Sequence, residues 1–200
     1  DEAHLLRLMG TATDTSVLSD GQRALLAAYR HAKEQALIER MKQGARKRVE
    51  VVLTDTNGHD GRNVARDFWP YSNGDLLQIN SLRFNTPDGE DEARSTMVHE
   101  CAHSMDRAQA ERDAPYGPDG THYINEVIKP RAAFMEGWAV FLQMCDSPER
   151  ASWWPNVCRD VKTERSKGVY DTASATALDG VTLTRVEGIN GLVLLNMSKL

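Results

Sequence analysis

The spacing of apolar residues divides the chain into helical and strand-like segments. Residues 20–43 carry apolar side chains at helical spacing after polar residues that can cap a helix, which predicts one long helix. A second long helix is predicted over 91–112, with acidic residues in the first turn, where the helix dipole favours them. A third is predicted over 131–145, because Pro130 is well tolerated at a helix start.

Short segments between and after these helices have the character of strands. Residues 48–54 alternate and are rich in β-branched side chains, and 75–80 form a second short apolar run. A fourth helix is predicted over 148–161, followed by strands over 181–186 and 192–195. Helices therefore dominate, and the predicted fold class is α+β, with a small mixed sheet before the second long helix.

Composition narrows the class of protein. Of the 200 residues, 40% are apolar and 26% charged, which is enough apolar material for a packed core. No apolar run approaches the roughly 20 residues of a membrane span, so none is predicted. The net charge of −5 argues against a general nucleic-acid-binding protein.

The three cysteines do not decide in which cellular compartment the protein works, although the sequence weakly favours an exported protein. There is no C-x-x-C pair, and Cys145 and Cys158 can form a disulfide if the chain is exported. The sequence begins at Asp1 and has no signal-like apolar segment. We therefore expect either that a leader has been removed or that the sequence starts inside a longer protein.

The strongest chemical signal is an H-E-x-x-H pattern in the second long helix. His99 and His103 are about 1.1 turns apart, so both imidazoles leave the same face and can bind one cation. Glu100 lies about 100° around the helix, where its carboxylate can reach a water molecule on that cation without binding it. An exposed helix that carries two histidines by chance is the alternative, unless a third ligand exists.

Glu136 is the candidate third ligand. It is the only acid in the apolar stretch 131–142, and an ionised carboxylate in such surroundings is costly unless it is paired or bound to a metal. Gly137 beside it allows another backbone to approach closely. Two histidines and one glutamate leave the fourth position of a tetrahedral Zn²⁺ open for water, as in catalytic zinc sites. We therefore expect one Zn²⁺ per chain, bound by His99, His103 and Glu136.

These residues resemble the gluzincin group of zinc metallopeptidases. The segment Glu136-Gly137-Trp138-Ala139 is similar to the Glu-Gly-Phe-Ala stretch of aminopeptidase N-like enzymes, in which that glutamate is the third zinc ligand. The resemblance covers the stretch 99–139. It implies a mainly helical zincin-like core, in which a two-helix zinc platform lies beside a sheet whose edge strand holds an extended peptide. The segment 75–80 is the candidate for that edge strand.

Departures from the family pattern define the alternatives. A Gly-x-Met-Glu-Asn stretch of the kind that anchors a substrate amino terminus is absent, which favours an endopeptidase over an aminopeptidase. The segment around Glu126 resembles the third-ligand segment of thermolysin, so Glu126 rivals Glu136. We prefer Glu136 because it lies in the middle of an apolar helix, while Glu126 comes shortly before Pro130.

The expected mechanism assigns roles to the remaining candidates. Glu100 takes a proton from the attacking water and passes it to the leaving amine. The oxyanion needs a further donor, for which His122 and Tyr123, between the two metal-binding helices, are the candidates. Asp106, one turn after His103, either orients an imidazole or is a surface acid. Cys101 is expected to be a small buried residue rather than a nucleophile.

The sequence thus predicts a zinc-dependent endopeptidase that acts on a peptide or protein. The alternatives are a metal-stabilised binding module without activity and a zinc hydrolase of a non-peptide amide. One domain is expected over 1–200, made of an N-terminal helical segment (1–47), a zinc-binding core (48–145) and a C-terminal segment (146–200). Nucleic acid is not expected as a partner, and the oligomeric state is left open.

Overall fold

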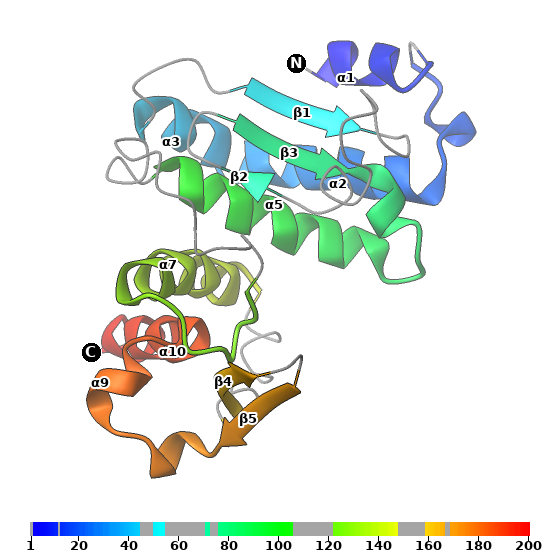
Figure 1. The fold of residues 1–200 in the computed structure, drawn as a ribbon. Helices are drawn as coiled ribbons and strands as arrows, with labels where there is room; N and C mark the ends of the chain where they lie inside the picture. Colours follow the sequence, from blue (N-terminus) through cyan, green and yellow to red (C-terminus); the bar gives the residue numbers. More distant parts are fainter. Residues whose placement is uncertain are drawn as a thin grey trace. The chain divides into compact units, whose positions relative to one another are not determined.

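The chain forms two compact units, each with its own helices and small sheet (Figure 1). The computed structural model describes residues 2–11, 13–44, 50–54, 71–72, 76–105, 122–147, 159–166 and 169–200. Unit 1 is Asp1–Glu111 and unit 2 is Arg112–Leu200. Helices dominate among the described residues, which confirms the α+β class. The boundary between the two units, after Glu111, lies inside the stretch 48–145 that is expected to form the zinc-binding core. The expected single domain over 1–200 stays a prediction.

Unit 1 consists of helices and a small mixed sheet, against which α5 packs. Its elements are α1 (Glu2–Leu8), η1 (Thr15–Val17), α2 (Asp20–Glu34), α3 (Leu37–Gly44), β1 (Glu50–Thr54), β2 (Tyr71–Ser72), β3 (Leu76–Asn80), η2 (Ser81–Phe84) and α5 (Gly89–Met105). The sheet has the order β1-β3-β2, with β1 parallel and β2 antiparallel to β3. Both strands predicted before the second long helix are therefore present, as β1 and β3.

The expectation that residues 75–80 form an edge strand is wrong. Strand β3 pairs with β1 along its whole length, from Glu50 opposite Leu76 to Thr54 opposite Asn80. On its other side Tyr71 lies opposite Gln78, in β2. Strand β3 is thus central among the described strands, because β2 returns to cover the side that a sequence pattern alone leaves open.

The single helix predicted over 20–43 is also wrong, because the chain turns at Ala36. The Gln35 N–H donates to the His31 carbonyl (2.9 Å) and the Ala36 N–H donates to the Lys33 carbonyl (3.1 Å), which ends α2. Ala36 has a φ of 55°, a left-handed conformation that glycine usually supplies after a helix. With no glycine or proline at this position, the apolar spacing gives no sign of the break.

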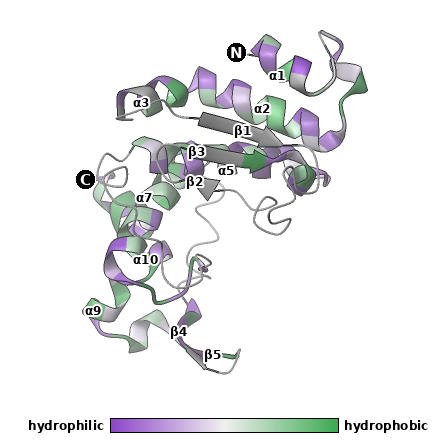
Figure 2. Cartoon of the chain, turned by 45° about the horizontal axis from the view of Figure 1, so that its top comes forward, coloured by the Kyte–Doolittle hydropathy of each residue, from purple (hydrophilic) through white to green (hydrophobic). Residues whose placement is uncertain are grey.

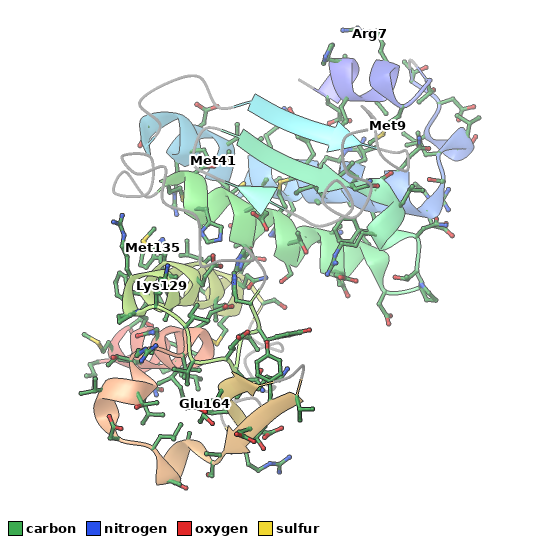
Figure 3. The ribbon with its side chains drawn as sticks, viewed as in Figure 1. Arg7, Met9, Met41, Lys129, Met135 and Glu164 are labelled. Carbon is green, nitrogen blue, oxygen red and sulfur yellow. The ribbon has the colours of Figure 1, made fainter. Side chains whose placement is uncertain are left out.

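The turn gives α3 a direction of its own and lets it pack against α5. Leu37 and Met41, which follow the turn, are buried. Met41 is labelled in Figure 3. Helix α5 packs against α2, α3 and the sheet. Burial of Leu37 and Met41 removes apolar surface from water, which offsets the unfavourable backbone conformation of Ala36.

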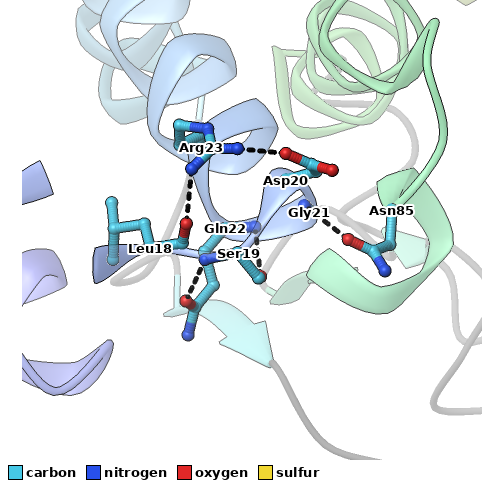
Figure 4. A network of polar contacts seen from close by, with 7 residues as sticks. All are labelled: Leu18, Ser19, Asp20, Gly21, Gln22, Arg23 and Asn85. Carbon is cyan, nitrogen blue, oxygen red and sulfur yellow. Dashed lines mark hydrogen bonds and ion pairs between the residues drawn. The ribbon is translucent and has the colours of Figure 1, made fainter. Parts of the chain in front are cut away.

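The start of α2 is fixed by a network of polar contacts (Figure 4). Ser19 and Gln22 form a reciprocal capping box, in which each side chain accepts a hydrogen bond from the other residue's backbone N–H. The Gly21 N–H donates to Asn85 Oδ1 (3.2 Å). A Cβ at Gly21 would lie 2.1 Å from the Ser81 carbonyl oxygen, so only glycine allows this approach. The contact joins α2 to the segment that leads into α5.

The core of unit 1 lies between α2, the sheet and α5. Leu25, Ile79 and Phe84 are among its fully buried side chains. A second cluster joins α1 to α2, with Met9 packed against it (Figure 3). Hydrophobic and hydrophilic residues alternate along α2, as expected for a helix with one buried face (Figure 2).

The described part of unit 2 contains two longer helices, α7 and α10, short helical turns and a β-hairpin. Its elements are α7 (Pro130–Asp146), β4 (Val161–Ser166), β5 (Val169–Ala173), η4 (Ala175–Ala177), α9 (Gly180–Leu183) and α10 (Glu187–Met197). Helix α7 matches the helix predicted over 131–145, with Pro130 in its first turn. Strands β4 and β5 pair antiparallel, and α10 packs along α7.

The strands predicted over 181–186 and 192–195 are wrong, because these residues lie in or next to helices. The Asp179 side chain accepts hydrogen bonds from the N–H and hydroxyl of Thr182 (both 2.9 Å), which starts α9. The apolar run of α10 is helical because it packs against α7. Most of the helix predicted over 148–161 lies outside the described residues, and at Val161 strand β4 begins.

No helix among the described residues combines the length and the apolar character that crossing a membrane requires.

The left-handed conformation of Ala36 predicts that Ala36→Gly stabilises the protein. Relief of the Cβ conflict should raise the free energy of unfolding by about 1 kcal/mol. Ala27→Gly in the middle of α2 is the control, and it should lower this free energy by about 1 kcal/mol. Urea denaturation measures both. A loss of stability in Ala36→Gly equal to that of the control would contradict the observed turn.

Candidate metal centre

Helix α5 in unit 1 holds the two histidines of the H-E-x-x-H pattern side by side. The ring centroids of His99 and His103 are 4.7 Å apart, with the ring planes inclined at 80°. His103 is buried (4% exposed), whereas His99 is half-buried. The expected placement of both imidazoles on one helix face is therefore observed.

The residues between the histidines are buried as well. Glu100 is only 6% exposed, so its carboxylate is largely removed from water. Cys101 is 1% exposed, and this burial, together with the charge of Glu100, raises the pKa of its thiol far above the ordinary value. Cys101 is thus unreactive at neutral pH, as expected of a small buried residue.

In unit 2, α7 buries Glu136 in the middle of an apolar stretch. Glu136 is 3% exposed, and Met135 before it (Figure 3) and Ala139 after it are buried too. Removing an ionised carboxylate from water is costly unless a positive group or a metal ion compensates it. The position therefore requires a partner of opposite charge.

His122 and Glu187 lie beside Glu136 in the same unit. His122 Nε2 is 3.5 Å from Glu136 Oε2 and 3.2 Å from Glu187 Oε2. The three side chains offer ligand atoms within 4.8 Å of one another, so they form a cluster that can hold a metal ion. With the imidazole protonated, two carboxylates against one imidazolium still leave one negative charge in excess, which favours a bound cation.

The two carboxylates control the protonation of His122. Burial lowers the pKa of its imidazole, but the hydrogen bonds and charges of Glu136 and Glu187 together raise it more, to about 10. In the metal-free protein His122 is therefore positively charged at neutral pH.

Backbone hydrogen bonds explain why these three residues meet. The segment that follows His122 pairs with the residues before α10: Val127 forms an antiparallel bridge with Val186, and the Ile128 N–H donates to the Arg185 carbonyl (2.8 Å). The Gly188 N–H donates to the Ile124 carbonyl (2.8 Å). These bonds hold His122 close to the first turn of α10, where Glu187 lies.

The other two candidates from the sequence have different surroundings in unit 2. Glu126 accepts hydrogen bonds from the Tyr170 hydroxyl (3.1 Å) and the Tyr123 N–H (3.2 Å), one with each carboxylate oxygen. Tyr123 is 49% exposed, and Lys162 Nζ lies 3.7 Å from the centre of its ring. Both oxygens of Glu126 thus already serve donors of the protein, which makes it the poorer candidate for a metal ligand.

Glu187 is the residue that sequence reasoning missed. Like Glu136, it is an acid within an apolar segment, followed by Gly188-Ile189-Asn190-Gly191-Leu192. The same argument about a buried carboxylate applies to it, but Glu187 falls between the strands predicted over 181–186 and 192–195, where the sequence predicts no buried helix. Asp106 and Cys158 lie outside the described residues, so the proposed roles of both stay predictions; Cys145 is exposed.

Comparisons of the chain with models of protein families, with curated proteins and with solved structures give no match. The assignment of function therefore depends on the residues and their geometry.

The contacts of His122 predict an unusual histidine titration in the metal-free protein. By NMR after chelation, the imidazole of His122 should stay protonated up to about pH 10, instead of losing its proton near its ordinary pKa of about 6.5. Because the pKa is raised in the folded state, the stabilising contribution is complete below about pH 6.5 and is lost as the pH rises to about 10.

Glu187→Gln is the control for this titration. It removes one of the two charges that raise the pKa of His122, so the pKa should fall. The NMR signal that titrates at high pH can be assigned to His122 because it should be absent from the His122→Asn variant. Titration of all histidines near their ordinary pKa would contradict the observed cluster.

Proposed function

We propose that the protein is a zinc-dependent peptidase, in which His99, His103 and Glu136 bind one Zn²⁺ and Glu100 is the general base. The observation that carries the proposal is the pair of adjacent imidazoles on α5, with the buried carboxylate of Glu100 between them in sequence. The buried carboxylate of Glu136 and the resemblance of its segment to gluzincins support the third ligand.

The proposed ligands fit zinc by their chemistry. Zinc binds imidazole nitrogen and carboxylate oxygen at about 2.0–2.2 Å, and three such protein ligands are typical of a catalytic site. Bound zinc lowers the pKa of a water molecule to near 7 and polarises the scissile carbonyl. A cation also compensates the excess negative charge of the cluster formed by His122, Glu136 and Glu187.

The side chains of the protein carry the proton transfers. Glu100 takes one proton from the water molecule as the oxygen attacks the carbonyl carbon of the substrate. It then delivers that proton to the amide nitrogen as the carbon–nitrogen bond breaks, which releases an amine and a carboxylic acid, and the acid then loses its proton to solvent. Glu100 is buried and follows His99 directly on α5, which supports its assignment as the base.

The oxyanion of the intermediate requires a hydrogen-bond donor, for which we propose the Tyr123 hydroxyl. The Tyr123 side chain is exposed and therefore accessible to a substrate. His122, the other candidate from the sequence, directs Nε2 at two carboxylates, so we expect its effect on the reaction to pass through Glu136. Tyr123→Phe and His122→Asn distinguish the two, since only the former should slow cleavage without weakening zinc binding.

The substrate in this proposal is an extended peptide bound to a zincin-like core. An extended peptide can add to the edge of a sheet through main-chain hydrogen bonds. Because β3 is central among the described strands of unit 1, the peptide would pair with β1 or β2 instead.

Metal content tests the proposed ligands. The purified protein should bind about one zinc per chain, and His99→Ala and Glu136→Gln should each remove it, because each deletes one of three protein ligands. Glu126→Gln is the matched control and should retain the metal, because both oxygens of Glu126 contact other donors. Elemental analysis measures the content. If Glu136→Gln retained zinc and Glu126→Gln lost it, Glu126 rather than Glu136 would be the third ligand.

Loss of the general base tests the activity. Glu100→Gln should lower peptide cleavage by about 10²–10⁴-fold, while zinc content and melting temperature stay native. Asp91→Asn, at an exposed position in the first turn of the same helix, should leave cleavage and zinc content native. Cleavage is measured as new peptide termini in a denatured proteome. Native cleavage by Glu100→Gln would refute the mechanism, and absence of any cleavage by the zinc-loaded native protein would refute the peptidase.

A further inference from the structure

Close packing of α7 against α10 connects Glu136 to Glu187. Gly137, the residue after Glu136, lies against the backbone of α10: a Cβ there would lie 2.9 Å from the Glu187 carbonyl oxygen and 2.4 Å from Asn190 Cβ. On α10, a Cβ at Gly191 would lie 2.5 Å from a methyl carbon of Val140. Two glycines thus let the helix backbones approach closely, and this approach brings the first turn of α10 to the middle of α7.

His122 occupies the space between the two carboxylates. Its Nε2 lies nearer to Glu187 Oε2 (3.2 Å) than to Glu136 Oε2 (3.5 Å). Glu187 is 5% exposed and lies in the first turn of α10, where the helix dipole favours a negative charge. Glu187 is therefore a fixed negative group that can hold the imidazole of His122 against Glu136.

We propose that Glu187 is a positioning residue for the metal ligand Glu136 and acts through His122. This inference rests on the proposed zinc site. A carboxylate that is held through one oxygen keeps the other for a cation, and its orientation no longer has to be fixed when the cation binds. Glu187 and His122 thus prepare Glu136 to bind zinc, and Gly137 fixes the distance over which they act.

The affinity of the full chain for zinc tests this role. In competition with a chelator, Glu187→Gln should bind zinc about 10–100-fold more weakly than the native protein, still with one ion per chain. Glu187→Asp, which keeps the charge, should recover part of the affinity. The matched control is Glu126→Gln, which removes a carboxylate in the same unit that contacts Tyr170 and Tyr123 and should keep the native affinity.

A double-mutant cycle tests whether Glu187 acts through His122. His122→Asn should weaken zinc binding by a similar factor, and adding Glu187→Gln to it should cause little further loss. The melting temperature of each metal-free variant separates positioning from folding. A purely structural role of Glu187 would lower that temperature and leave the zinc affinity of the folded protein unchanged.

Several results would overturn the inference. Native affinity in Glu187→Gln would show that Glu187 does not prepare the site, and additive losses in the double variant would show that it does not act through His122. Complete loss of zinc in Glu187→Gln would make Glu187 a ligand. Failure of the proposed function is distinct: zinc would persist in His99→Ala or Glu136→Gln, whatever the result for Glu187.

Discussion

A carboxylate buried in an apolar helix is the constraint on which unit 2 depends. Glu136 is almost fully buried in α7, where an ionised group is stable only with positive charge nearby. His122 supplies such a charge, but Glu187 brings a second buried carboxylate to the same imidazole. An arrangement that served only to neutralise Glu136 would not need a second acid. The excess of negative charge is explained if the site has evolved to hold a cation.

The backbone makes this combination of charges possible. Glycines at the crossing of α7 and α10 bring the helices together, and the strand-like pairing of Val127 with Val186 holds the His122 segment beside them. In unit 1, the left-handed turn at Ala36 and the cap at Ser19 direct α2 and α3 onto α5, which carries the histidine pair. In both units, the elements around a buried charged side chain or a candidate metal ligand are positioned by a few close backbone contacts.

Local signals made part of this predictable from sequence. The H-E-x-x-H spacing predicts adjacent imidazoles on α5, and Pro130 with the apolar run after it predicts α7. The other features of the fold and the site depend on contacts between segments that are distant in the sequence. The break at Ala36 has no local marker, and the apolar run of α10 is a helix whose Leu192 and Leu195 pack against Val140 and Met144 of α7, a contact that the local pattern does not show. Glu187 lies between the strands predicted over 181–186 and 192–195, where the sequence gives no sign that it is buried, so the burial argument that identifies Glu136 does not reach it.

X-ray absorption spectroscopy of the zinc-loaded protein tests the central claim most directly, because it reports the ligands of the ion itself. Two imidazoles and one carboxylate predict scattering from nitrogen and oxygen alone, at about 2.0–2.2 Å, with the outer-shell pattern of two imidazole rings. A spectrum that shows one imidazole would move the ion to His122, Glu136 and Glu187. Sulfur at about 2.3 Å would contradict the account altogether, because it would make a cysteine a ligand.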